Sequence, residues 1–323
     1  MRRVGRARRG WGIALACLLV RSADAALPGF RFEEGFEKPA STSASAYLAS
    51  RGWYDLANPV ITTAESHSGS SSLAYTIPQG QVAAGGMRLQ IPPSHTVYLR
   101  FARKVPTTWL WPIGDHALHD FYVWANASAY QSPTSVPFAY YVEQSSRTVS
   151  GVRRNGIAFV QTKNAAGVYT GYEDPQLTPV FTSGVWHVVY ATIRMNDPGQ
   201  ANGELTLSVD GVERIRRTGL TFQASTASLL FDQIFFGPYF HEGARQTQTF
   251  WTDDIAISDT PISDAVAVPL PGWMPGLIGV LLLALTSPRG VSPTGLPSRC
   301  GSSDIHPRRA RRWKTQRPPP LAP

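Results

Sequence analysis

Apolar and polar residues alternate along two segments near the middle of the chain. From Glu204 to Asp210 the odd positions are Leu, Leu and Val, and the even positions are polar. From Trp186 to Arg194 one face holds a Val, an Ala and an Ile at alternate positions. A period of two is typical of half-buried antiparallel strands. The Asp210-Gly211 pair that follows favours a tight turn, because glycine adopts positive φ without steric cost.

Similar short segments recur along the mature part of the chain, without a sustained helical period or an internal repeat. They begin at Phe30-Arg31-Phe32, and the others lie at 73–77, 97–103, 119–124, 138–143, 156–161, 229–236 and 250–257. About ten short strands joined by Gly, Pro, Asn and Ser turns predict a two-sheet fold rather than a βαβ fold. The expected fold is therefore an all-β, antiparallel β-sandwich.

The first 25 residues have the pattern of a secretory signal peptide. An Arg-rich start precedes an apolar run from Trp11 to Val20, and Ala23-Asp24-Ala25 is a small-x-small cleavage site. We therefore expect residues 1–25 to be removed and the mature protein to begin near Ala26. Export is expected to leave it periplasmic, at the cell surface or extracellular.

The C-terminal part carries a second targeting pattern. Val268-Pro269-Leu270-Pro271 precedes an apolar run from Trp273 to Thr286, and Arg289 follows. This run is too short to cross a hydrocarbon core of about 30 Å comfortably. The order resembles PEP-CTERM sorting signals, which implies transient inner-membrane anchoring and processing by an exosortase-like enzyme. We expect a sandwich domain over 26–264, a sorting or anchor-like segment over 265–289 and a disordered Pro/Arg-rich tail over 290–323. A loosely anchored or disordered tail is the other interpretation.

Charge and cysteine content narrow the function classes. The formal net charge is +8, but the basic excess lies in 1–25 and 287–323, so that 26–286 has 16 basic and 20 acidic residues. A net charge of −4 over that part gives no reason to expect nucleic-acid binding. The two cysteines, Cys17 and Cys300, lie outside the expected domain. The domain must therefore be held by its core alone, and we expect a monomer.

Five stretches follow one another in an order that resembles a known group of proteins. They are FRFEEGFE at 30–37, HSGSSSLAYTIPQG at 67–80, VYLRFARKVPTTWLWPIGDHALH at 97–119, GVWHVVYATIRMNDPGQANGELTLSVDG at 184–211, and FDQIFFGPYFHEG with TFWTDDIAIS within 231–258. The order resembles the concanavalin A-like jelly rolls of heparinase I-like, alginate and glucuronan lyases. The resemblance implies an exported, glycan-active protein that cleaves or binds an extracellular, acidic polysaccharide.

The same layout also serves proteins that bind sugars without cleaving them, so the fold does not decide the function. Three hypotheses stay open. They are a polysaccharide lyase, a non-catalytic carbohydrate-binding or adhesion module, and a structural protein of an exopolysaccharide matrix. A lyase needs a His and a Tyr that converge with a basic or amide group on one concave sheet surface. A binding module needs only aromatic rings and amides there.

Candidate catalytic residues lie in two places. β-Elimination needs a base, an acid and a group that neutralises the uronate carboxylate, and His, Tyr and Arg suit these tasks. The resemblance implies a functional His near residues 114–120, and both His116 and His119 qualify. Tyr239 and His241 follow Gly237-Pro238 at the end of a strand, where alternation places them on one side.

The neighbours of His119 follow from the same alternation. On a strand that starts at Leu118, His119 is expected on the face of Phe121 and Val123, and Asp120 on the face of Tyr122 and Trp124. A histidine with a structural hydrogen bond is an alternative to a site role. Metal binding by Asp115, His116, His119 and Asp120 is disfavoured, because three-residue spacing suits a helix.

Substrate contacts are expected from Arg100 and from aromatic rings, which bind sugars in exposed grooves. The aromatic candidates are Tyr122, Trp124, Tyr140, Trp109 and Trp111, and the last two share a Pro-flanked loop. An ion pair is the alternative for Arg100, and a core position is the alternative for most of the rings. No cofactor is required. Asp253 and Asp254 could join Glu33 or Glu34 at a structural calcium site if the first and last strands pair, and solvated carboxylates are the alternative.

Overall fold

The computed structural model describes residues 29–112, 118–127, 136–164, 166–224, 226 and 228–262. The expected signal peptide, sorting segment and tail lie outside the described residues, as do Asp115 and His116. In the part that is described, no helix is both long and apolar enough to span a membrane.

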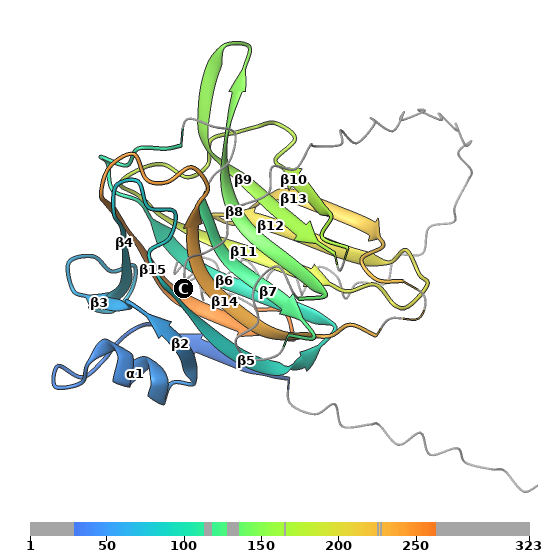
Figure 1. The fold of residues 1–323 in the computed structure, drawn as a ribbon, viewed down its shortest axis with the longest axis horizontal. Coiled ribbons are helices and arrows are strands. Elements are labelled where there is room, and N and C mark those ends of the chain that lie inside the picture. The colour runs from blue at the N-terminus through green and yellow to red at the C-terminus, as the bar shows by residue number, and fades with distance from the viewer. Residues whose placement is uncertain are drawn as a thin grey trace, which may run out of the picture. The chain divides into compact units, whose positions relative to one another are not determined.

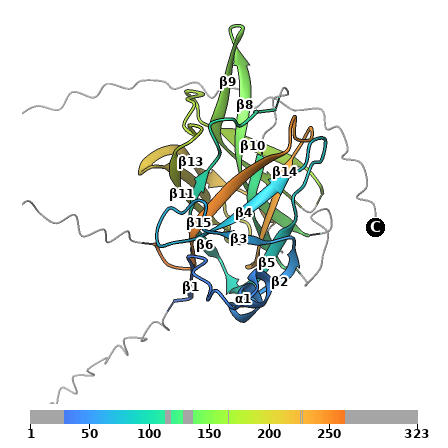
Figure 2. The same ribbon diagram turned by 90° about the vertical axis from the view of Figure 1, so that its left-hand side faces the viewer.

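Two antiparallel sheets face each other and confirm the predicted β-sandwich (Figures 1 and 2). The seven-stranded sheet consists, in spatial order, of β10 (Tyr169–Glu173), β9 (Val152–Lys163), β8 (Phe138–Val149), β7 (Leu118–Ala125), β14 (Phe231–Phe240), β5 (Gly86–Ser94) and β2 (Trp53–Ala57). The eight-stranded sheet consists of β13 (Val212–Leu220), β12 (Gly203–Val209), β11 (Trp186–Arg194), β6 (Thr96–Lys104), β15 (Gln248–Ser258), β4 (Ser72–Ile77) and β3 (Val60–Thr62), with β1 (Arg31–Glu34) also paired to β15.

One short helix interrupts the strands. The helix α1 (Ala44–Ser50) begins after Ser43, whose hydroxyl accepts a hydrogen bond from the backbone N of Ala46 at 3.1 Å. This is the usual way for a serine to satisfy a free N–H at a helix start. The helix is too short to show a helical period in the sequence.

The hairpin predicted from alternation is present. Strands β11 and β12 pair with Val189 opposite Val209, and their inward side chains belong to the core. The predicted tight turn at Asp210 and Gly211 joins β12 to β13. Both residues have positive φ, as such a turn requires. The Asp210 carboxylate also accepts a hydrogen bond from the backbone N of Val188 at 2.8 Å. Apolar side chains of both sheets fill the space between them.

Strand β7 departs from simple alternation, so the predicted neighbours of His119 and Asp120 are wrong. A β-bulge lies between His119 and Phe121, and β14 has a matching irregularity between Phe236 and Tyr239. An extra residue in a bulge inverts the faces beyond it. As a result, Phe121 belongs to the core between the sheets, and His119 contacts the rings of the opposite, outer face.

Asp120 turns into the core at this bulge. It forms an ion pair with Arg103 of β6, and both side chains are only 1% exposed. Gln144 donates a hydrogen bond to the same carboxylate at 3.1 Å. His119 and Asp120 therefore lie on opposite faces of one strand and do not form a common metal site.

Candidate functional site

The outer face of the seven-stranded sheet carries two rows of cross-strand partners. The first row runs through Tyr239, His119, Glu143, Phe159 and Glu173. The second row runs through Tyr54, Arg88, Phe235, Tyr122, Tyr141 and Gln161. Side chains at directly paired positions have Cβ atoms about 5 Å apart. Residues from five or more strands are thus brought side by side.

His119 lies at the centre of the titratable groups on this face. Its Nε2 is 2.8 Å from Nε2 of His241 and 3.2 Å from Oε1 of Glu143. The ring of Tyr239 lies 5.6 Å from that of His119 and 5.1 Å from that of His241. The structure therefore brings together three of the four residues proposed for catalysis. His116, the fourth, lies outside the described residues.

Exposure divides these residues into an accessible pair and a buried pair. His241 is exposed and Tyr239 is half-buried, whereas His119 and Glu143 are buried. A substrate on this face could touch the first pair directly. The second pair lies behind it and can hold His241 in place through the contact between the two Nε2 atoms.

Burial shifts the proton equilibria of the site. It raises the pKa of Glu143 to about 8, although the positive charge of Arg147 acts in the opposite direction. Glu143 therefore keeps its proton at neutral pH. Burial also raises the pKa of Tyr239, so its phenol stays protonated. The same cause raises the pKa of Tyr122 and Tyr141.

Tyr122 and Trp124 lie on the outer face, as the positions of substrate-binding rings require, but both are buried. The Arg88 guanidinium lies 5.0 Å from the ring of Trp124 and 4.9 Å from that of Phe235, and its Nε is 2.8 Å from the Asp55 carboxylate. These rings and the arginine form a packed floor. The half-buried Phe235 is the member that reaches the surface.

Three predicted substrate contacts do not belong to this face. Arg100 lies on β6 of the other sheet, between Tyr190 and Ala256, so the prediction that it shares a surface with His119 is wrong. The prediction that Tyr140 contacts substrate is wrong as well, because alternation along β8 turns this side chain into the core. Trp109 is 95% buried and packs against Phe240 and Phe250, because the loop folds back over the end of the core.

Trp111 is half-buried, and it lines a cleft at the end of the sandwich together with Arg153 and Arg245. The loop that carries it is fixed by Gln248, whose side chain bonds to the backbone N and O of Leu110. Trp111 therefore keeps the partial exposure expected of it, but it is not a member of the two rows on the sheet face.

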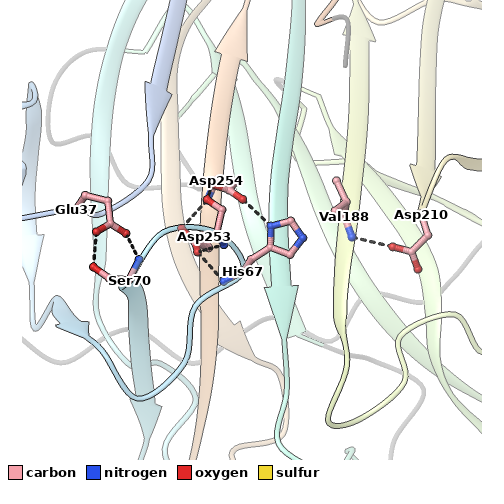
Figure 3. A network of polar contacts seen from close by, with 8 residues as sticks. Glu37, His67, Ser70, Val188, Asp210, Asp253 and Asp254 are labelled. Atoms are coloured by element: carbon pink, nitrogen blue, oxygen red, sulfur yellow. Dashed lines mark hydrogen bonds and ion pairs between the residues drawn. The ribbon is translucent and has the colours of Figure 1, made fainter. Parts of the chain in front are cut away.

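The expected calcium ligands have other partners. The first and last strands do pair, as β1 with β15, but Glu34 accepts hydrogen bonds from Phe36 N and the Tyr47 hydroxyl. Asp253 and Asp254 bind the 67–68 turn: the backbone N of His67 donates to Asp253 at 2.8 Å, and its ring lies 2.5 Å from the Asp254 carboxylate (Figure 3). Within the described ranges no three His, Cys, Asp or Glu side chains are arranged for a metal.

Sequence reasoning missed Glu143, Gln161 and Arg147 on this face. Glu143 is the last residue of the predicted strand 138–143, two positions after Tyr141, and an acidic residue on a buried strand face was the available signal. Gln161 of β9 pairs with Tyr141 of β8. Arg147 donates a hydrogen bond to the Glu173 carboxylate at 2.8 Å. Their relation to His119 depends on the strand order, which the sequence pattern does not contain.

Comparisons with known proteins bear on the class of protein. A model of the polysaccharide lyase 14 family matches residues 146–253, which include Tyr239 and His241. No match was found among curated proteins. The family match covers less than half of the chain, and it supports a polysaccharide-lyase-like class.

Solved structures add a likeness in fold. Alginate lyase Aly36B in complex with alginate trisaccharide is similar over 72% of this chain and 98% of its own, with 11% identity and a TM-score of 0.50. The PL-14 alginate lyase from Aplysia kurodai covers 70% of this chain and 97% of its own, at 14% identity and a TM-score of 0.49. An endo-β-1,4-glucuronan lyase from the fungus Trichoderma reesei covers 72% and 95%, at 12% and 0.48.

Proposed function

We propose that this protein is a polysaccharide lyase that cleaves an acidic polysaccharide by β-elimination. The observation that carries the proposal is the convergence of His119, His241 and Tyr239 on one sheet face. The match of residues 146–253 to the polysaccharide lyase 14 family supports it.

The reaction needs two proton transfers at neighbouring atoms. A base takes the C5 proton of a uronate, the C5–H electron pair forms the C4=C5 double bond, and the C4–O bond breaks. The leaving oxygen then takes a proton from an acid. No water is consumed, and the new non-reducing end carries the double bond.

We assign the two transfers to the accessible pair. Tyr239 keeps its proton because burial raises its pKa, which suits the acid that protonates the leaving oxygen. His241 is exposed and suits the base, and the buried His119 orients its ring from behind. Glu143 is neutral at pH 7, so it does not repel the carboxylate of a bound uronate.

The uronate carboxylate needs a group that neutralises it. Gln161 lies in the row on one side of His119, and Arg147 lies further along β8 on the other side. An amide or a guanidinium can both donate hydrogen bonds to a carboxylate. These two side chains replace Arg100 in the proposed mechanism.

An absorbance screen for unsaturated uronate tests the proposal. The full chain is incubated with alginate, glucuronan, polygalacturonate and heparin, and the ultraviolet absorbance of the C4=C5 bond is followed. We expect at least one polymer to give product. A folded protein that produces no absorbance with any acidic polymer, over a wide pH range, would rule out β-elimination.

One observation favours the alternative function, carbohydrate binding without cleavage. A shallow groove of about 380 Å³ crosses the outer face of the eight-stranded sheet, and it is lined by Tyr98, Tyr190, Thr192, Thr206 and Ser208 among others. Tyrosine rings and hydroxyls are suited to sugar contacts. Binding that persists in Tyr239→Phe but is lost in Tyr98→Ala would support this function.

Export is also a proposal, and it rests on the sequence of residues 1–25. Intact-mass analysis of protein from a secreting host should show a mature start near Ala26. Retention of the Arg-rich start would contradict it. A chain limited to 26–264 should melt cooperatively, because the described strands end at Ser258. The exosortase-like processing of 265–289 is tested by the mass of the C-terminus.

A further inference from the structure

A second cleft lies beside the β8–β9 hairpin, and no residue of the two rows on the sheet face lines it. Its volume is about 450 Å³, within the range of small-molecule sites. The residues that line it are Trp109, Leu110, Trp111, Pro112, Thr148, Arg153, Asn155 and Arg245. They come from the loop after β6, from the β8–β9 hairpin and from the loop between β14 and β15.

A glycine bulge in β9 shapes this cleft. Gly156 has a φ of 68°, and the β8–β9 register shifts between Ser145 and Ser146. A Cβ at Gly156 would lie 2.7 Å from the Phe181 carbonyl oxygen and 3.2 Å from the Trp111 ring. Only glycine therefore allows both the positive φ and the close packing of the ring. Figure 1 shows the hairpin projecting beyond the neighbouring strands.

The charge of the cleft is positive. Arg153 is held by the Pro112 carbonyl, to which it donates a hydrogen bond at 2.8 Å. Arg245 is exposed and forms no ion pair with any described residue. None of the described lining residues is acidic. An arginine without a partner in such a cleft is suited to a carboxylate or another anion.

The cleft also offers a ring and unused hydrogen-bonding atoms. Trp111 is half-buried, so part of its ring is available to a ligand. The Nε1 of Trp109 is a donor and the Oδ1 of Asn155 is an acceptor, and neither has a hydrogen-bond partner among the described residues although both atoms are buried. Buried polar atoms usually find a partner. Sugar hydroxyls can both donate and accept.

We propose that this cleft is a second saccharide-binding site, which takes a negatively charged sugar unit such as a uronate. Arg245 binds the carboxylate, Trp111 packs against the sugar ring, and Asn155 and Trp109 bind hydroxyls. The site rests on the proposed function only for the choice of uronates as the charged sugar. His241 and Arg245 lie in the same β14–β15 loop, so the two sites share a structural element.

Calorimetric titration of the full chain tests the site. The Tyr239→Phe variant serves as background, so that the probe is not cleaved during the titration. The probes are tetrasaccharides of glucuronate, mannuronate and guluronate, with cellotetraose as the neutral counterpart. We expect a uronate tetrasaccharide to bind about 10-fold more weakly after Arg245→Gln. The loss should be smaller at high salt, where exposed charges are screened.

Arg31→Gln is the matched control, because it removes one exposed positive charge from β1 of the other sheet. The Arg31→Gln variant should bind the uronate tetrasaccharide with the same affinity as the Tyr239→Phe background. The site is rejected if Arg245→Gln binds as tightly as Arg31→Gln, if cellotetraose binds as tightly as the uronates, or if no probe binds. Trp111→Ala should weaken binding without changing its salt dependence.

The outcomes for this site and for the lyase are separable. Arg245-dependent binding without any unsaturated product in the absorbance screen would support the cleft and reject the lyase. Product formation together with an Arg245→Gln chain of unchanged affinity and unchanged KM would support the lyase and reject the cleft.

Discussion

The two sheets differ in burial along β11 and β12 of the eight-stranded sheet and β7 of the seven-stranded sheet. On the eight-stranded sheet, β11 and β12 alternate along their whole length, and every outward side chain is half-buried. On the seven-stranded sheet, all residues of β7 are buried, including those on the outer face. The first face is an ordinary solvated surface with a shallow groove. On the outer face of the seven-stranded sheet, His119 is only 6% exposed and Glu143 only 3%.

The difference arises from backbone irregularities at matching places. The bulge beside His119 and the irregularity at Gly237-Pro238 lie opposite each other in β7 and β14. They turn titratable side chains to a face that is otherwise packed with rings. Groups removed from water have shifted proton equilibria, and on this face the buried His119 and Glu143 lie beside the accessible His241.

The largest expected effect compares one tyrosine on each face. Tyr239→Phe should lower turnover of a cleaved polymer by roughly 10²–10⁴-fold, because the leaving oxygen loses its acid. Tyr190→Phe removes the same hydroxyl from the other face and should leave turnover unchanged. The initial rate of absorbance increase measures both. Equal rates for the two variants would remove Tyr239 from the mechanism.

The turnover of His241→Ala should fall by about as much as that of Tyr239→Phe. The turnover of His119→Gln should fall less if His119 acts only by orienting His241. Binding of an uncleaved uronate tetrasaccharide should persist in all three variants. A His119 variant that is less active than the His241 variant would exchange the two roles.

The second effect concerns stability at the bulge. Arg103→Met should lower the free energy of unfolding by roughly 3–5 kcal/mol, because Asp120 would remain charged in the core without its partner. Arg103→Met combined with Asp120→Leu should recover a large part of this loss, since the pair is replaced by apolar side chains. Urea unfolding measures both. A double variant less stable than Arg103→Met would contradict this account.

The sandwich could be predicted from the sequence because alternation records burial directly. Residues 186–194 and 204–210 needed no knowledge of their neighbours, and the turn at Asp210-Gly211 follows from backbone geometry. The same reasoning failed at His119, because a bulge leaves no periodic signal and inverts the faces beyond it. One added residue therefore placed His119 on the face of Tyr122, and Asp120 on the core side with Phe121.

Residue patterns alone could predict the site only where its residues lie close in sequence, and His119 was proposed from the family resemblance. Tyr239 and His241 follow a Gly-Pro pair at a strand end, and alternation places them together. Arg100 is polar and lies on a half-buried strand, but β6 belongs to the other sheet, and strand order cannot be read from local pattern. Glu143 and Gln161 were missed for the same reason.

The third effect is a pH dependence that arises from one buried carboxyl group in each sheet. Burial raises the pKa of Glu143 from its ordinary 4.5 to about 8, so the folded state binds this proton more tightly than the unfolded state. Its contribution to stability is complete below pH 4.5 and is lost as the pH rises through 8. Burial also raises the pKa of Asp253 from 3.8 to about 6. Its contribution to stability is likewise lost as the pH rises, but at lower pH than that of Glu143.

Glu143→Gln should therefore flatten the fall in stability from about pH 4.5 to pH 8, and leave the fall that Asp253 causes between its ordinary pKa of 3.8 and its raised pKa of about 6. Melting temperatures across this range provide the measurement. Glu33→Gln, an exposed carboxylate on β1, is the control and should follow the native curve. A Glu143→Gln curve parallel to the native one above pH 6 would show that Glu143 titrates normally.

The smallest expected effect belongs to an exposed ion pair on the eight-stranded sheet. Arg216 and Glu213 form a close pair on β13, but their side chains are 56% and 43% exposed. The hydrogen bonds lower the pKa of Glu213, yet water and salt screen the charges. A double-mutant cycle with Arg216→Gln and Glu213→Gln should give a coupling of about 0.2–1 kcal/mol, and salt should reduce it further. The Arg103–Asp120 pair should keep its coupling in salt because water does not reach it. Equal salt dependence for both pairs would mean that burial does not protect the Arg103–Asp120 pair from screening.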